Sequence, residues 1–61
     1  MYHILNRRGE YLTRDTIPAA WGEAEFAIGY PLHREAARTI RRLWPMTARA
    51  VGCKIVWEAK Y

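Results

Sequence analysis

Two prolines, Pro31 and Pro45, bound the clearest helical pattern in this sequence of 61 residues. Proline fits the first turn of a helix and prevents a helix from continuing, so the pair predicts a helix over 31–43. Apolar residues recur within it at helical spacing and predict a buried stripe that consists of Leu32, Ala36, Ile40 and Leu43, with Ala37 and Trp44 beside it. An amphipathic helix of this kind needs a second element against which to pack.

The sequence before this helix predicts a β-hairpin. Residues 2–6 and 10–13 are rich in β-branched and aromatic residues, which favour strands. The Asn-Arg-Arg-Gly sequence that links them is a turn signal, because Gly9 can take a positive φ. The loop of the hairpin would therefore display Arg7 and Arg8.

The stretch between hairpin and helix is less regular. Residues 14–23 contain Pro18 and Gly22, show no sustained period and predict a loop with room for one helical turn. Residues 24–28 lie between two glycines and predict a short third strand. Alanine and glutamate favour a helix there instead, so both structures remain open for this segment.

The last part of the chain alternates strictly and predicts a strand with one buried face. The buried face would carry Val51, Cys53, Ile55, Trp57 and Ala59. The other face would carry Lys54, Val56, Glu58 and Lys60. The order β-β-(β)-α-β then predicts one α+β domain over 1–61, in which a helix packs on one face of an antiparallel or mixed sheet of three to four strands.

Length and cysteine content set further expectations. A domain of 61 residues buries a small core, and the last strand can leave a sheet edge open, so we expect a homodimer or stabilisation by a partner. Cys53 is the single cysteine, which excludes an intrachain disulfide and favours a reducing cytoplasm. No apolar run is long enough to span a bilayer, so no membrane partner is expected.

Charge is distributed unevenly along the chain, whose net charge is +4. Residues 31–54 carry six basic side chains against Glu35 alone, whereas residues 9–30 are acidic. The predicted outer face of the helix carries Arg34, Arg38, Arg41 and Arg42. This pattern is typical of a solvated helix face, and equally of a contact surface for an acidic protein or a nucleic acid.

The sequence offers little that predicts catalysis or a cofactor. It contains no serine and no glycine-rich phosphate loop, and its cysteine falls on the predicted buried face. His3, His33 and Cys53 are the soft metal-ligand candidates, and they lie far apart in sequence. We therefore expect no enzyme, no metal and no cofactor.

The tryptophans allow two interpretations. Trp57 fits the core pattern, whereas Trp21 falls in the irregular segment and Trp44 lies beside Pro45. Filling of the core is one role, and anchoring an interface is the other, because tryptophan and arginine are enriched at binding hot spots.

The first thirteen residues, MYHILNRRGEYLT, resemble the start of small proteins of bacteriophages and mobile elements. The resemblance extends loosely through Trp21, the 23–26 segment and the Glu35-Ala36-Ala37 helix, and its motifs are structural. Several phage proteins of this size bind and disable a host protein, and anti-CRISPR proteins are the best-known class.

The resemblance implies an inhibitor that occludes a surface of a host protein, such as a CRISPR–Cas or other defence component in the host cell cytoplasm, without catalysis. A small basic nucleic-acid-binding module is the alternative. The residues predicted to bind the partner are Arg34, Arg38, Arg41, Arg42, Arg7, Arg8 and Trp21.

Overall fold

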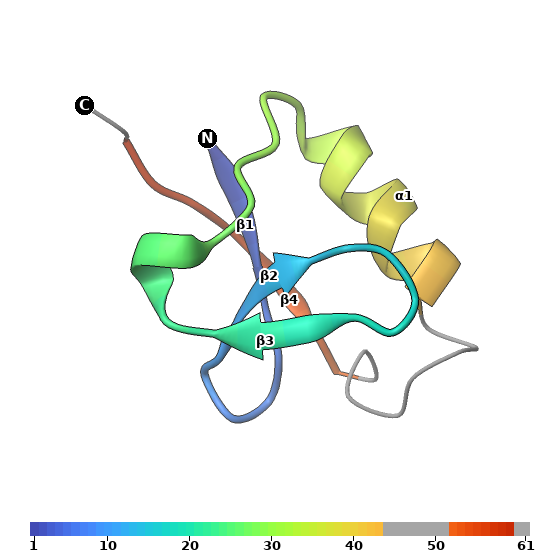
Figure 1. The fold of residues 1–61 in the computed structure, drawn as a ribbon. Helices are drawn as coiled ribbons and strands as arrows, with labels where there is room; N and C mark the ends of the chain where they lie inside the picture. The colour runs from blue at the N-terminus through green and yellow to red at the C-terminus, as the bar shows by residue number, and fades with distance from the viewer. Residues whose placement is uncertain (44–51, 60–61) are drawn as a thin grey trace.

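A computed structural model describes residues 1–43 and 52–59, which form a small α+β fold (Figure 1). Four strands make one antiparallel sheet in the order β3-β2-β1-β4, and one helix packs on it. The elements are β1 (Tyr2–Leu5), β2 (Tyr11–Arg14), β3 (Ala20–Gly22), the 3-10 helix η1 (Ala24–Phe26), α1 (His33–Leu43) and β4 (Lys54–Trp57). The predicted fold class is therefore confirmed.

The hairpin of β1 and β2 is confirmed, and a buried asparagine shapes its loop. The Asn6 Oδ1 atom accepts hydrogen bonds from the backbone N–H groups of Arg8 and Glu10, at 2.9 and 3.0 Å. The Asn6 amide also donates to the Glu10 carboxylate at 2.9 Å. Gly9 has φ of 79°, the positive value that the turn requires.

The third strand lies earlier than predicted. β3 occupies 20–22 and pairs with β2 through Leu12↔Trp21 and its neighbours, inside the stretch that was predicted to be a loop. The strand predicted at 24–28 is wrong, because 24–26 forms η1 with an exposed Phe26. Alanine and glutamate are weak strand formers, and no buried face at 24–26 compensates for that.

An extended segment that follows η1 joins the two hairpin strands where they diverge. β1 and β2 pair at Leu5↔Tyr11 and then separate. The Ile28 N–H donates to the Leu12 carbonyl at 3.0 Å. Tyr2 and Tyr30 exchange two backbone hydrogen bonds, of 2.7 and 2.8 Å. Residues 28–30 therefore satisfy backbone groups that the hairpin alone leaves unpaired.

The helix begins two residues later than predicted, and this shift changes its buried stripe. Leu32 precedes α1, its carbonyl accepts the N–H of Ala36, and its side chain is 42% exposed, so its predicted burial is wrong. Ala36 and Leu43 are buried as predicted, and Thr39 is buried between them. The core consists of Ile4, Leu12, Tyr30, Ala36 and Leu43, with Ile40 partly buried against it.

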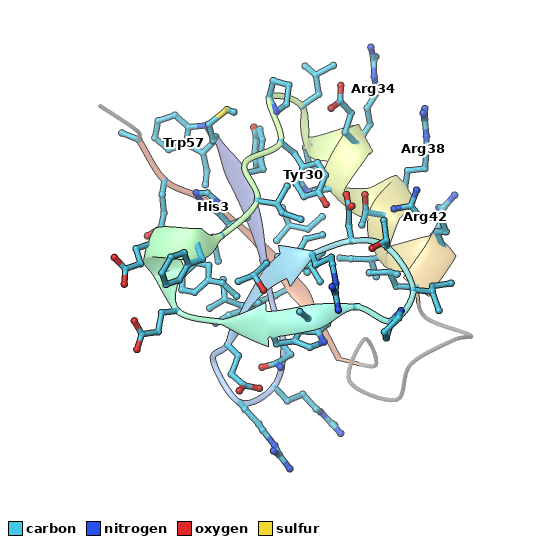
Figure 2. All side chains as sticks on the ribbon, in the orientation of Figure 1. His3, Tyr30, Arg34, Arg38, Arg42 and Trp57 are labelled. Atoms are coloured by element: carbon cyan, nitrogen blue, oxygen red, sulfur yellow. The ribbon has the colours of Figure 1, made fainter. Side chains whose placement is uncertain are left out.

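β4 confirms part of the predicted alternation. Cys53 and Ile55 pack against the core, but Trp57 is 61% exposed, which contradicts its predicted burial. The cross-strand neighbour of Trp57 is Tyr2, whose ring meets His33 in the first turn of α1 edge-on at 5.5 Å. Trp57 therefore lies on the same face of the sheet as α1, at its margin and outside the area that the helix covers (Figure 2). The predictions for Trp44, Val51 and Lys60 lie outside the described residues.

Candidate functional site

Three arginines follow the outer side of α1 at positions 34, 38 and 41, and we call Arg34, Arg38 and Arg41 the arginine face. All three are exposed, and the labelled Arg34 and Arg38 point away from the sheet (Figure 2). Within residues 1–43 and 52–59 none of them forms an ion pair. Residues spaced three and four apart lie on one side of a helix. This side faces solvent, because Ala36 and Leu43 on the opposite side of α1 are buried in the core. The structure therefore presents three cations on a rigid element.

Arg42 differs from the arginine face because it binds within the molecule. Its guanidinium donates to the Asp15 carbonyl at 2.8 Å and lies 3.8 Å from the Asp15 carboxylate. Arg14 in turn donates to the Pro18 carbonyl at 3.2 Å. Arg42 therefore fastens the loop after β2 to the last turn of α1, beside the arginine face.

Tyr30 holds the same loop from the core side. Its hydroxyl donates to the Asp15 carboxylate at 3.0 Å, and the residue is buried. The pKa of Tyr30 is raised to about 12, mainly by burial; hydrogen bonding and charge from Asp15 also raise it, whereas Thr39 and Arg42 act in the opposite direction. Asp15 thus links the loop to both the core and the helix. No local sequence pattern predicts this cluster, because its members are distant along the chain.

An open hollow of about 340 Å³ lies next to this cluster. Asp15, Thr16, Ile17 and Arg42 line it, and the Ile17 side chain is 58% exposed. A carboxylate, a guanidinium and an apolar side chain therefore meet at the end of the helix that carries the arginine face.

The other predicted binding residues lie elsewhere. Arg7 and Arg8 are exposed on the hairpin loop, away from the outer side of α1 (Figure 1). The Arg7 side chain covers Gly52, where an added Cβ would lie 2.7 Å from the Arg7 Nε atom. Trp21 is half-buried in β3 and packs against the core. The structure thus brings Arg42 close to the arginine face and separates the hairpin arginines from it.

A polar cluster around His3 was not predicted. His3 is 2% exposed, and its Nδ1–H donates to the Ile28 carbonyl at 2.8 Å. Its Nε2 atom lies 3.9 Å from the Glu58 carboxylate, and the Tyr11 ring stands edge-on at 5.9 Å. Burial and a hydrogen bond with Glu58 raise the pKa of Tyr11. The cluster joins three parts of the sheet, and its histidine is too buried to reach an external ligand.

The soft metal-ligand candidates occupy three separate places. His3 is inside the sheet, His33 begins α1, and Cys53 is half-buried before β4, where burial raises the pKa of its thiol. In the described part of the chain, no three His, Cys, Asp or Glu side chains gather as a metal site would require.

The chain was compared with protein families, curated proteins and solved structures. No protein-family model, no curated protein and no solved structure matches the chain. Among the described residues, no helix has the length and apolar character needed to cross a bilayer. The fold and the arginine face together define a small α+β protein with a cationic helix surface.

The Tyr30 hydroxyl predicts a loss of stability at alkaline pH. Its pKa is about 12 in the folded chain, against 10.0 for an ordinary tyrosine, so folding favours the protonated form. This contribution is fully present below pH 10 and is lost as the pH rises toward about 12, by about 3 kcal/mol in all. Urea unfolding at about pH 9 and about pH 11.5 should show that the gap between wild type and Tyr30→Phe narrows. Curves that stay parallel would contradict this role of Tyr30.

Proposed function

We propose that this chain is a non-catalytic inhibitor, of the kind that phages encode, which binds an acidic surface of a host protein such as a defence component. The arginine face makes the principal contact, and inhibition follows from steric occlusion. The observation that carries the proposal is the set of three exposed arginines on one helix, which form no ion pair with any other described residue.

Arginines in this state are well suited to binding carboxylates. A guanidinium forms two parallel hydrogen bonds with one carboxylate, and it is hydrated more weakly than an ammonium group. Among residues 1–43 and 52–59, no ion pair has to break before Arg34, Arg38 and Arg41 bind a partner. The helix backbone is already ordered, so association costs less conformational entropy than it would for a flexible basic segment.

The surroundings of the arginine face favour a protein over a nucleic acid. The neighbouring hollow presents the exposed Ile17, which suits an apolar side chain of a protein, and its Asp15 carboxylate is paired with Arg42. A cationic patch beside an apolar position is typical of a protein interface, where a few residues provide most of the binding energy. A nucleic-acid-binding module is the alternative, because the same arginines also suit phosphates.

An affinity pull-down from host lysate, with and without nuclease, tests the class of partner. We expect the immobilised chain to retain a protein after nuclease treatment, and the purified partner to lose its activity at a one-to-one ratio. Binding to a protein through a few hot-spot residues should depend less steeply on salt than binding along a phosphate backbone. Recovery of nucleic acid alone would contradict the inhibitor and support the alternative.

A further inference from the structure

β4 forms one edge of the sheet, and its backbone shows which residues face outward. Met1 and Glu58 exchange two backbone hydrogen bonds, of 2.8 and 2.9 Å, so they are a hydrogen-bonded pair of the β1–β4 ladder. Such pairs alternate in an antiparallel ladder, so Ile55 and Trp57 direct their N–H and C=O groups away from β1. Tyr2, opposite Trp57, bonds to Tyr30 on its far side, as this alternation requires.

The outward row at Ile55 and Trp57 has no partner within residues 1–43 and 52–59. An open strand edge is a template for another strand, and proteins usually protect it. Here the side chain beside it is the exposed Trp57, on the face of the sheet that carries α1. Backbone groups and an aromatic side chain are therefore available together at this edge.

The sequence of β4 is complementary to itself when it is reversed. In an antiparallel pair of two copies, the outward residues must form the hydrogen-bonded pairs, so Ile55 can lie opposite Trp57 of the second copy. This register is centred on Val56 and sets Lys54 opposite Glu58 of the second copy, twice. Lys54 and Glu58 are both exposed on the other face of the sheet, and Glu58 keeps about half of its side chain open to solvent beside its contacts with His3 and Tyr11.

Neither neighbouring register provides this match. Pairing Ile55 with Ile55 of the second copy sets Lys54 opposite Val56, and pairing Trp57 with Trp57 sets Glu58 opposite Val56. Opposite charges placed directly across a ladder stabilise it, as does an aromatic residue opposite a β-branched one. The register centred on Val56 contains both kinds of pair.

We infer that β4 binds β4 of a second copy of this chain, antiparallel and centred on Val56, so that the two four-stranded sheets join into one. Trp57 of each copy then packs against Ile55 of the other, which covers its exposed ring. A two-fold axis that passes midway between the two Val56 residues, perpendicular to the sheet, places both α1 helices on the same face. This surface is separate from the arginine face, and the inference does not depend on the proposed function.

Two charge reversals test the register, because each disrupts its own dimer and should pair with the other. Lys54→Glu places Glu opposite Glu58, and Glu58→Lys places Lys54 opposite Lys, so each variant alone meets two repulsive pairs. We expect the dimer dissociation constant of each to rise about ten- to hundredfold over wild type in sedimentation equilibrium. An equimolar mixture of the two variants should recover a species of about twice the 7.2 kDa chain.

Recovery in the mixture also shows that both variants fold. Glu58→Lys could unfold the chain, because Glu58 contacts Tyr11 and His3. In that case a synthetic chain with a methyl group on the backbone nitrogen of Trp57 takes the place of this variant. That methyl group removes an outward donor, leaves the β1–β4 ladder intact and should leave a folded monomer. A wild-type chain that stays monomeric up to about 1 mM overturns the inference. So do reversals that dimerise like wild type, or a mixture of two folded variants that does not associate.

Discussion

Reversing two arginines of the arginine face should abolish partner binding without unfolding the chain. In Arg38→Glu/Arg41→Glu, two carboxylates would meet the acidic surface of the partner, and like charges across an interface cost several kcal/mol. That corresponds to a loss of affinity of more than about a hundredfold. Both side chains are exposed and form no ion pair with the residues that the structure describes, so stability should change by less than about 0.5 kcal/mol per site. Calorimetric titration against the purified partner measures the loss.

The hairpin loop provides a control with the same change in charge. Arg7→Glu/Arg8→Glu alters the net charge equally, at a position away from the outer side of α1. This variant should associate with the partner more slowly, because long-range electrostatic attraction is weaker, and it should keep most of the affinity. Equal losses in both double variants would mean that only net charge matters. If the Arg38/Arg41 variant binds like wild type, the arginine face is merely solvated, and the hairpin loop or Trp21 becomes the better candidate.

Two leucines at the ends of the helical segment should respond very differently to truncation. Leu43 is 1% exposed in the core, so Leu43→Ala should cost about 2–5 kcal/mol through lost burial and a cavity. Leu32 is 42% exposed, so Leu32→Ala should cost less than about 1 kcal/mol. A chain of 61 residues has about 3–9 kcal/mol of stability in total, so Leu43→Ala should be largely unfolded at elevated temperature.

Thermal unfolding followed by circular dichroism compares these two variants directly. The sequence predicted both leucines to be buried, because both fit the same helical stripe. Similar melting temperatures for the two variants would therefore support the sequence pattern over the observed start of α1 at His33.

The parts of the fold that could be predicted have strong local signals. The hairpin turn depends on Asn6 and Gly9, which act within four residues, and the start and end of α1 follow from nearby prolines. The alternation of apolar and polar residues around Cys53 and Ile55 directly predicts a strand with one buried face. Such signals do not depend on distant parts of the chain.

The parts that could not be predicted depend on tertiary contacts. β3 forms at 20–22 because β2 offers it a pairing edge, whereas its own sequence resembles a loop. Trp57 is exposed because the helix does not extend over it, which the alternation of its strand cannot reveal. For the candidate site, the four exposed arginines were predicted, but the contact of Arg42 with Asp15 joins residues 27 positions apart and has no local signal.

The pairing of β1 with β4 has a consequence for how the chain folds. β1 lies inside the sheet, yet one of its two neighbours is the strand at 54–57, so Tyr2 meets its ladder partner Trp57 only after nearly the whole chain has closed on itself. Closing a loop of this length costs about 3 kcal/mol or more in chain entropy before any contact repays it. During synthesis, the hairpin and α1 therefore emerge before the strand that completes their sheet, and we expect the meeting of the first and last strands to slow folding.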